Sequence, residues 1–345
     1  MIERLEHLAI MAPNWVGDLV MATPMLEAAL AAPHVARVSV VVREHLAPLL
    51  RDGPLEPCVR AHGKGRELET LRELAPDAAV LLSNSFGAAW RAWRAGIPLR
   101  MGSALSQRRF LLTHSVVPPS RDGRRVPIPT AHLLRDVVGL AGVGVDSLHP
   151  RLHVRDEVRE AQRATLRELG LDTERGYVAV CPGAAFGAAK LWPPDRFAAA
   201  ADRLYDETGL RAAVSGGPGE EALIGAVCAA SRRGAVSLGR APRNLETLKA
   251  LVADAKLMLV GDSGPRWVAA AFDVPCVSIL GPNVPELTAS SLELCEVVRV
   301  ELECSPCAER VCPLGHHRCM TLVMVEQVVA AAKRVLERFA AGAPA

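Results

Sequence analysis

Three turns in the second half of the chain combine residue types that suit a phosphate-bearing ligand. Each follows an apolar run, and together they carry glycines, a lysine, acids and a hydroxyl group. The residues expected to bind there are Gly183, Ala184, Lys190, Glu220, Asp262, Ser263 and Gly264. Small residues let a ligand approach the backbone, Lys190 supplies a positive charge, and Glu220 could hold ribose hydroxyls. One such turn could merely close a tight bend, but three together predict a site for a nucleotide diphosphate.

The turn at Asp262-Ser263-Gly264 also stands at the start of a helix. It follows the apolar run 257–261 and precedes the helical run 268–272. A helix that begins there points backbone N–H groups and the positive end of its dipole at the turn. We therefore expect this turn to attract a phosphate group.

In the first half, the turn after the first expected strand presents Gly17-Asp18. A carboxylate at the start of a helix is most often a cap that stabilises the helix by about 1 kcal/mol. The same place suits a general base that deprotonates an attacking hydroxyl in a cleft between two domains. The residues alone leave both interpretations of Asp18 open.

Residues 84–125 contain eight arginines and one acid, Asp122. A solvated basic face would account for them, but guanidinium groups also bind carboxylate or phosphate in a forked geometry. The residues expected to bind an anionic acceptor are Arg91, Arg94, Arg108 and Arg109. Its aromatic residues, chiefly Trp90 and Trp93, are too few among the arginines to favour nucleic acid as a partner.

Four cysteines lie in one short segment with the spacing C-x₂-C-x₄-C-x₆-C. They are Cys304, Cys307, Cys312 and Cys319, and His316 and His317 lie in the last gap. Four thiols at this spacing predict a structural Zn²⁺ site, with an iron–sulfur cluster as the weaker option and plain thiols as the alternative. A closed site of four cysteines has no open position, so we expect a structural role and no catalytic cofactor.

Other nucleotide-binding signatures are missing from the sequence. Gly63-Lys64-Gly65 lacks the upstream glycine and the hydroxyl of a P-loop, and the glycines at 139–144 are wrongly spaced for a dinucleotide fingerprint. These absences count against a kinase and against a Rossmann oxidoreductase.

Alternating apolar runs and helical patterns must position these turns. Strands are expected at 8–12, 37–42 and 78–82, and again at 177–181, 211–215, 257–260 and 274–280. Continuous apolar runs fit parallel strands that are covered on both faces. Two sets of β–α units predict an α/β protein with two Rossmann-like domains.

The expected domains are residues 1–155, which would bind the acceptor, and residues 156–325, which would bind the nucleotide and contain the cysteine-rich loop 304–319. An amphipathic helix at 322–339 and a tail to residue 345 follow. Pro118, Pro119, Pro127 and Pro129 bracket a charged segment, 120–125, which we expect to be an exposed loop of the first domain.

Composition and apolar patterning indicate the cellular compartment in which we expect the protein. Half of its 345 residues are apolar and its formal net charge is +2, but no apolar run approaches the roughly 20 residues that a membrane span needs. The first residues include acids and lack a long apolar core, unlike a secretory signal. We therefore expect a cytoplasmic protein whose nine cysteines are reduced thiols or metal ligands.

Several of these motifs together resemble glycosyltransferase family 9, the ADP-heptose:lipopolysaccharide heptosyltransferases, and the heptosyltransferase II branch most of all. The resemblance covers nearly the whole chain. It rests on N-W-V-G-D at 14–18, N-S-F at 84–86, A-G-I-P at 95–98, C-P-G-A at 181–184, K-L-W-P at 190–193, G-D-S-G-P at 261–265 and G-P at 281–282.

This resemblance implies a GT-B fold, with two facing Rossmann-like domains of parallel sheets and a cleft between them, and an inverting, metal-independent mechanism. By motif, Asp18 is similar to the base that deprotonates the acceptor. Lys190 is similar to the group that stabilises the departing diphosphate, assisted by N–H groups around Ser263 and Gly264. Glu220 is similar to the acid that holds the donor ribose. Fixed donors at the leaving diphosphate would lower the barrier, because negative charge builds there as the bond breaks.

The implied reaction moves heptose from ADP-heptose to the inner core of lipopolysaccharide. The acceptor would be an anionic lipid-linked oligosaccharide of the Kdo–lipid A type, reached at the inner face of the cytoplasmic membrane by peripheral contact. The family pattern D-S-G-x-x-H has His where this chain has Trp267. Tryptophan cannot present a charged donor to phosphate. The alternatives are therefore a family 9 transferase with another nucleotide sugar, or a non-catalytic nucleotide-sugar binder.

Overall fold

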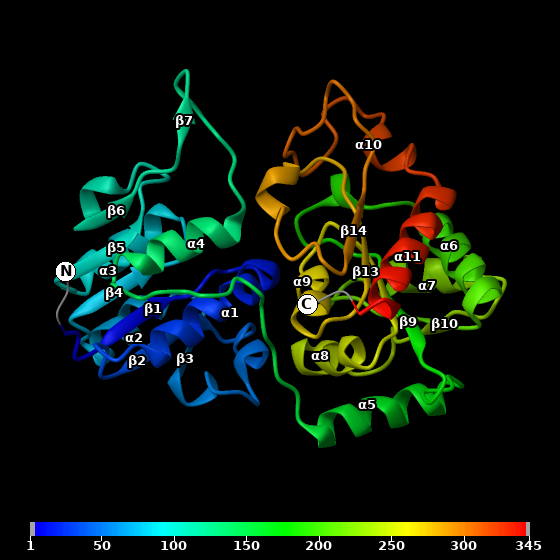
Figure 1. Cartoon of the computed structure of the whole chain (residues 1–345), viewed down its shortest axis with the longest axis horizontal. Coiled ribbons are helices and arrows are strands. Elements are labelled where there is room, and N and C mark those ends of the chain that lie inside the picture. Colours follow the sequence, from blue (N-terminus) through cyan, green and yellow to red (C-terminus); the bar gives the residue numbers. More distant parts are fainter. Residues whose placement is uncertain (1–3, 343–345) are drawn as a thin grey trace. The chain divides into compact units, whose positions relative to one another are not determined.

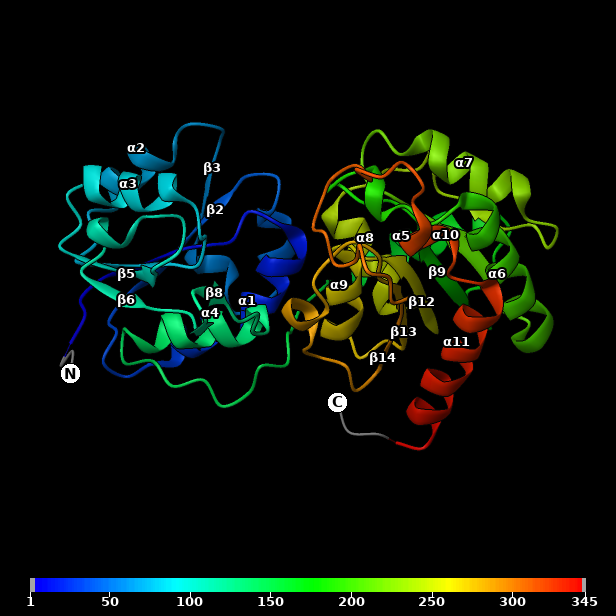
Figure 2. The same cartoon turned by 90° about the horizontal axis from the view of Figure 1, so that it is seen from above.

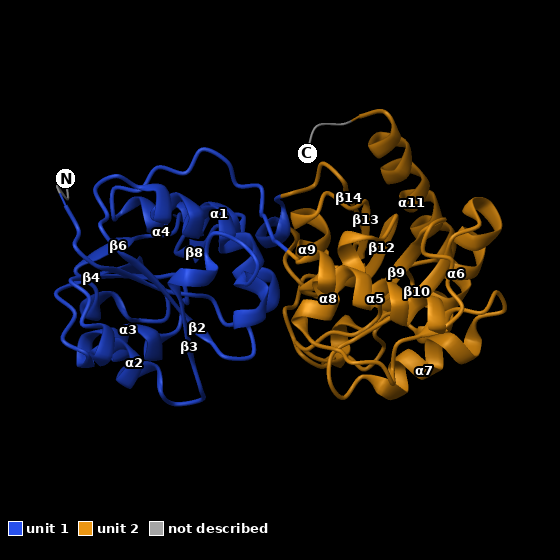
Figure 3. Ribbon diagram, turned by 90° about the horizontal axis from the view of Figure 1, so that it is seen from below, with its two compact units in different colours: residues 1–153, 286–290 blue, residues 154–285, 291–345 orange. Residues whose placement is uncertain are grey.

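The computed structural model describes residues 4–342, so the last three residues of the expected tail lie outside the described part. The chain forms two compact units, coloured separately in Figure 3. Unit 1 comprises residues 1–153 with 286–290, and unit 2 comprises residues 154–285 with 291–345. In the described part of the chain, no helix combines the length and the apolar character that a membrane crossing requires.

Unit 1 is built on a six-stranded sheet in the order β3-β2-β1-β4-β5-β6, and every pairing is parallel. Its strands are β1 (Leu8–Met11), β2 (Val38–Arg43), β3 (Val59–His62), β4 (Ala78–Leu81), β5 (Leu99–Ser103) and β6 (His114–Val116). Strands β1 and β4 are buried along their whole length, which is why their sequences are continuous apolar runs.

Two pairs of helices cover this sheet (Figure 2). Helices α1 (Val16–Ala31) and α4 (Thr130–Gly139) pack together, and so do α2 (Glu67–Leu74) and α3 (Phe86–Arg94) on the other face. Short 3₁₀ turns are η1 (Ala47–Leu50), η2 (Glu56–Cys58) and η3 (Arg109–Leu111). The segment 120–125, expected to be a loop, is an exposed antiparallel hairpin of β7 (Ser120–Arg121) and β8 (Arg124–Arg125).

Unit 2 repeats the scheme with a parallel sheet in the order β11-β10-β9-β12-β13-β14. Its strands are β9 (Tyr177–Cys181), β10 (Arg211–Val214), β11 (Val236–Ser237), β12 (Leu257–Gly261), β13 (Cys276–Ile279) and β14 (Cys295–Val298). Figure 1 labels its helices, which are α5 (Asp156–Glu168), α6 (Pro194–Thr208), α7 (Glu221–Ala230), α8 (Leu245–Ala253), α9 (Pro265–Ala271), α10 (Arg318–Thr321) and α11 (Val325–Ala340). Its 3₁₀ turn is η4 (Ala188–Lys190), whereas η5 (Pro285–Thr288) lies almost wholly in the segment 286–290, which belongs to unit 1.

Both sheets therefore have the strand order of a Rossmann fold, and the predicted class, two α/β domains with parallel sheets, is confirmed. Each order reverses once, between β1 and β4 in unit 1 and between β9 and β12 in unit 2. Ligands of open α/β sheets bind at the carboxyl ends of strands beside such a reversal.

The amphipathic helix expected at 322–339 is present as α11, which begins three residues later, and residues 322–324 separate it from the short α10. Two side chains satisfy the exposed backbone of this break. The fully buried Trp192 donates from Nε1 to the Val323 carbonyl at 3.1 Å, and Arg196 donates to the same oxygen at 2.6 Å. Trp192 also packs edge-on against Phe197, so the core of unit 2 holds this segment in place.

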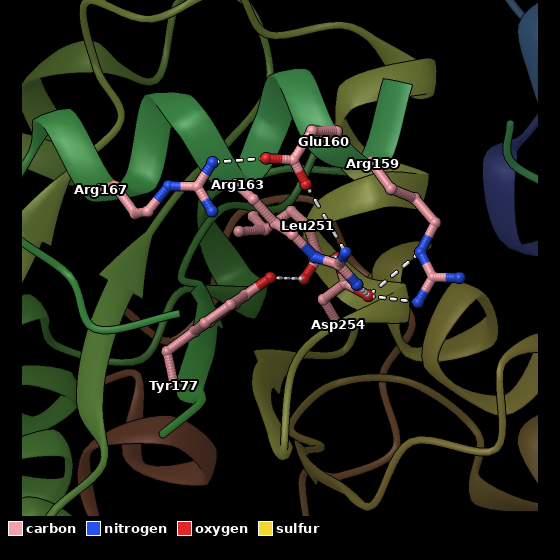
Figure 4. A network of polar contacts seen from close by, with 7 residues as sticks. All are labelled: Arg159, Glu160, Arg163, Arg167, Tyr177, Leu251 and Asp254. Carbon is pink, nitrogen blue, oxygen red and sulfur yellow. Dashed lines mark hydrogen bonds and ion pairs between the residues drawn. The ribbon is translucent and has the colours of Figure 1, made fainter. Parts of the chain in front are cut away.

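Asp254 anchors helix α5 to the end of α8 in unit 2 (Figure 4). Its carboxylate accepts hydrogen bonds from Arg159 and Arg163 of α5, including one of 2.9 Å from Arg163 Nε. Below them, the Tyr177 hydroxyl of β9 donates to the Leu251 carbonyl at 2.6 Å. The Asp254 side chain is only 9% exposed, so this pair of contacts is screened by solvent less than a surface ion pair.

We expect Asp254→Asn to lower the free energy of unfolding by about 2 kcal/mol, because two guanidinium groups lose the charge that they share. Urea denaturation measures the change. Glu160→Gln is the matched control, since Glu160 pairs with Arg167 on the open surface of the same network. A surface pair contributes little to stability, so the control should unfold like the wild type. Equal effects of the two substitutions would contradict this account.

Candidate functional site

The predicted donor-binding residues lie at the carboxyl edge of the unit 2 sheet, beside the reversal of strand order. Strands β9 and β12 pair with Cys181 opposite Val260, so the turns that follow them begin at the same edge. The first turn leads through Gly183 and Ala184 to Lys190, and the second carries Asp262 and Ser263. Neighbouring strands thus bring together residues that are about 80 positions apart in the sequence.

Lys190 and Asp262 form a buried ion pair that joins the two turns. Lys190 Nζ lies 2.6 Å from Asp262 Oδ2, and the two side chains are 10% and 9% exposed. The ammonium also lies 4.6 Å from the centroid of the Phe186 ring. The Asp262 carboxylate therefore neutralises the Lys190 ammonium while no anion is bound. Asp262 is therefore better suited to hold the ammonium in place than to contact a phosphate itself.

The Glu220 carboxylate lies over Gly183 and Gly216. A Cβ atom added at Gly183 would meet the carboxylate at 2.1 Å, and one added at Gly216 would meet it at 2.6 Å. Glu220 also accepts a hydrogen bond of 2.7 Å from the Gly217 N–H. The sequence suggested that these glycines admit a ligand, but the space above them is filled by Glu220. Residue 183 must therefore be glycine for Glu220, the acid that could hold a ribose, to occupy this position.

The turn before α9 differs from the expected array of unpaired N–H groups. The N–H of Ser263 donates to the Gly261 carbonyl, and those of Arg266 and Trp267 donate to Ser263 and Gly264. Pro265 has no N–H at all, and α9 has only seven residues. The local positive charge at this edge comes mainly from Lys190 and not from the helix. The buried Ser263 hydroxyl has no hydrogen-bond partner in residues 4–342.

Trp267, at the position where the family pattern has His, is buried in α9. The Arg266 guanidinium stacks on its ring at 4.4 Å from the centroid. Arg266 itself is only 3% exposed. The Cys276 side chain first, and then the nearby Arg266 guanidinium, lower the pKa of the Cys295 thiol, which lies in β14. Arg266 therefore does not replace the missing histidine at the turn.

The cysteine-rich loop 304–319 supports the turn that carries Lys190. The Ala189 N–H donates to the Arg310 carbonyl at 3.0 Å, and His317 Nε2 lies 2.7 Å from the Ala189 carbonyl. Gly187 has φ +153°, and a Cβ there would meet the Arg310 carbonyl oxygen at 2.5 Å. Only glycine allows the loop to approach this closely. The loop thus fixes the backbone on either side of the lysine.

The four cysteines of this loop influence one another. Burial raises the pKa of the Cys319 thiol, and the thiols of Cys307, Cys312 and Cys304 raise it further. Backbone N–H groups, that of His317 first, lower the pKa of Cys312. Among residues 4–342, however, no three His, Cys, Asp or Glu side chains converge in an arrangement that could hold a metal ion.

In unit 1, polar residues gather at the carboxyl ends of β1 and β4, which also flank the reversal of strand order. Asp18 lies in the first turn of α1, three residues after Trp15, which precedes the helix. Asn14 Nδ2 donates to the Ser83 hydroxyl at 3.3 Å, and the Ser85 hydroxyl caps α3. Asp18 is thus presented at the edge where the fold binds ligands, as a general base would need to be.

Arg108 does not fit the predicted contact with an acceptor, because its side chain is fully buried. Its guanidinium donates to the carbonyls of Ser83, Ser85 and Ser103 and to the Ser103 hydroxyl. Burial lowers the pKa of Arg108 to about 10. The arginine ties the end of β4 to the end of β5 beneath the polar edge. Its role is to position that edge.

The other predicted acceptor arginines lie on or near the surface. Arg91 Nε is 2.6 Å from a Glu67 carboxylate oxygen, so this side chain links α3 to α2. Arg94 and Arg109 are exposed. Arg108 and Arg109 are adjacent in the sequence, and no feature of the sequence indicates which of the two is buried.

The sequence profile of glycosyltransferase family 9 (heptosyltransferase) matches residues 65–318, about three quarters of the chain. The chain belongs to glycosyltransferase family 9. The match contains every predicted donor-binding residue and all four arginines, whereas Asp18 lies before it. Lipopolysaccharide heptosyltransferase 2 of Escherichia coli K12 is 28% identical to the chain over 305 residues, which are 84% of this chain and 87% of that protein.

Two solved glycosyltransferase structures have a fold similar to that of the whole chain. The E. coli ADP-heptose lipopolysaccharide heptosyltransferase II matches with a TM-score of 0.75 at 24% identity, covering 97% of this chain and 99% of that one. TibC from enterotoxigenic E. coli, an iron-containing dodecameric glycosyltransferase, matches with a TM-score of 0.59 at 14% identity, covering 99% and 81%. The family 9 fold therefore extends over both units of the chain.

We expect Arg108→Met to lower the free energy of unfolding by about 3 kcal/mol, because it leaves three buried carbonyls without a donor. Its neighbour offers a matched control, Arg109→Met, which removes an exposed guanidinium and should not change stability measurably. Thermal and urea unfolding of both variants compare them. Full stability of Arg108→Met would show that Arg108 does not hold the edge together.

Proposed function

We propose that the protein is an inverting heptosyltransferase, which transfers heptose from ADP-heptose to the inner core of lipopolysaccharide. The observation that carries the proposal is the family match, whose span contains the lysine, the acids and the turns that suit a nucleotide diphosphate. The curated relative in E. coli, a lipopolysaccharide heptosyltransferase 2, supports the choice of donor and acceptor.

Unit 2 would hold the donor at the edge formed by the turns after β9 and β12. Lys190 would shift from Asp262 toward the diphosphate or bind both, since its ammonium has three donors. Glu220, held over Gly183, would accept hydrogen bonds from the ribose hydroxyls. As the bond between the sugar carbon and the diphosphate oxygen breaks, the leaving ADP gains negative charge. Lys190 would be the positive group that stabilises the leaving diphosphate.

Unit 1 would hold the acceptor at the edge formed by the ends of β1 and β4. Asp18 would take the proton of the acceptor hydroxyl as the hydroxyl oxygen attacks the sugar carbon from the side opposite the diphosphate. One displacement forms the new glycosidic bond, inverts that carbon and releases ADP, and the proton remains on Asp18 until solvent removes it. Arg94 and Arg109 would bind the anionic groups of a Kdo–lipid A acceptor.

Such an acceptor is lipid-linked, so we propose that the enzyme works in the cytoplasm at the inner face of the membrane, by peripheral contact. Transfer assays with ADP-heptose and a panel of other ADP-, GDP- and UDP-linked sugars test the donor. Transfer from another sugar in preference to ADP-heptose would overturn the donor assignment.

Asp18→Asn keeps the shape of the side chain but cannot accept the proton. We expect kcat to fall about 10²- to 10⁴-fold, the usual contribution of a general base, with little change in the affinity for ADP. Steady-state kinetics with ADP-heptose and calorimetry with ADP measure the two effects. A kcat within about threefold of the wild type would remove Asp18 from the role of base.

We also propose that the cysteine-rich loop binds a structural Zn²⁺ ion, with an iron–sulfur cluster as the weaker alternative. The spacing of the four thiols in one short loop supports this proposal. Metal analysis of purified protein should find about one ion per chain. The ion should be lost in Cys304→Ser with Cys312→Ser, but not in the control Cys58→Ser with Cys228→Ser. Purified protein that contains neither Zn²⁺ nor an iron–sulfur cluster, and takes up neither on reconstitution, would refute the site.

A further inference from the structure

Helix α3 of unit 1 buries its small residues and exposes its large ones. The buried side chains that face the sheet are those of Ala88, Ala89 and Ala92. The exposed ones are Phe86, Trp90 and Trp93, with exposed fractions of 44%, 41% and 49%. A helix optimised only for stability would bury its aromatic rings, because burying one aromatic side chain removes about 150–250 Å² of surface from water. The exposed rings therefore indicate a partner outside the unit.

These rings form one continuous surface. Phe86, Trp90 and Trp93 are spaced at i, i+4 and i+7, so they lie along one side of the helix. Phe110 of η3, which is 75% exposed, extends the row, since its ring centroid lies 6.1 Å from that of Phe86. We refer to these four side chains as the aromatic stripe.

Two arginines accompany the aromatic stripe. The Arg94 guanidinium lies 5.6 Å from the centroid of the Trp90 ring, and Arg109 is next to Phe110 in the chain. Neither has an ion-pair partner within the described residues 4–342, whereas the nearby Glu67 pairs with Arg91. The stripe therefore combines apolar rings with positive charge that the protein does not neutralise.

We infer that the aromatic stripe, with Arg94 and Arg109, docks on an anionic lipid bilayer. Indole and phenyl rings favour the interface between headgroups and acyl chains, and arginines there bind lipid phosphates. A second copy of the chain fits this surface less well, because a symmetric contact would bring like charges together. The inference rests on the proposed function in one respect, namely that a lipid-linked acceptor is drawn from that surface.

The position of the stripe agrees with this use. Helix α3 begins directly after Asn84 and Ser85, at the carboxyl end of β4. Docking through Phe86 and Phe110 would bring the polar edge of unit 1, which includes Asn14 and Asp18, to the level of the lipid headgroups. An acceptor sugar attached to lipid could then reach this edge without leaving the bilayer.

Vesicle flotation tests the inference with purified full-length protein. We expect the wild type to float with vesicles of phosphatidylglycerol and phosphatidylcholine, less at high salt, and much less with phosphatidylcholine alone. The variant Trp90→Ser, Trp93→Ser and Phe110→Ser should bind anionic vesicles at least about tenfold more weakly. The matched control, Leu169→Ser with Leu292→Ser, removes exposed apolar side chains of unit 2 and should bind like the wild type.

Charge and apolar contact can be separated in the same assay. Arg94→Glu with Arg109→Glu should weaken flotation with anionic vesicles, whereas Arg232→Glu with Arg240→Glu, two exposed arginines of unit 2, should not. Wild type that fails to float, or a triple serine variant that floats equally well, would overturn the inference. So would a wild-type dimer that the triple variant dissociates while neither binds vesicles.

Transfer assays distinguish this inference from the proposed function. The triple serine variant should retain transfer to a lipid-free acceptor oligosaccharide and lose most of its transfer to acceptor embedded in vesicles. Equal loss on both acceptors would contradict a role in docking. Wild type that floats with anionic vesicles but transfers heptose to neither acceptor would refute the proposed function and leave the docking surface intact.

Discussion

A buried ion pair between Lys190 and Asp262 joins the two turns on which the proposed chemistry depends. Removing two charges from water costs several kcal/mol per ion, so such a pair adds little net stability on its own. It does hold an ammonium in place at the reversal of strand order in unit 2. The surrounding contacts serve the same end, because the loop 304–319 fixes the backbone at Ala189 and Gly187 beside the lysine.

Unit 1 uses a buried charge in a different way. Arg108 places a guanidinium inside the fold, where it satisfies the carbonyls at the ends of β4 and β5. Asn14 and Ser83 lie in turns next to this arginine, outside any helix or strand, and the arginine holds the backbone from which their polar side chains extend. Each unit is therefore an ordinary parallel sheet that has buried charged side chains at the carboxyl ends of its strands. They are Arg108 in unit 1 and the Lys190–Asp262 pair in unit 2.

The sequence predicted the central strands well because β9, β12 and β13 are buried on both faces and appear as apolar runs. It missed the main-sheet strands β3, β5, β6, β11 and β14. All but β5 lie at an edge of a sheet, where strands such as Val59–His62 expose residues and show no continuous apolar run. Strand β5 lies inside its sheet, but Arg100 and Gly102 interrupt its apolar run. It placed the candidate donor turns correctly at strand ends. It could not show that Glu220 fills the space above Gly183, or that Arg108 is buried and Arg109 exposed, because both depend on side-chain packing between distant residues.

Calorimetric titration of the purified protein with ADP, GDP and UDP tests the central claim, that Lys190 forms the diphosphate site. Lys190→Gln is compared with Lys256→Gln, which alters an exposed lysine at the opposite end of the same sheet, and with Gly183→Ala, which displaces Glu220. The account predicts ADP binding that Lys190→Gln and Gly183→Ala each weaken by about tenfold or more, and that Lys256→Gln leaves unchanged. Wild type that does not bind ADP, or ADP binding that is equal in all four proteins, would contradict it.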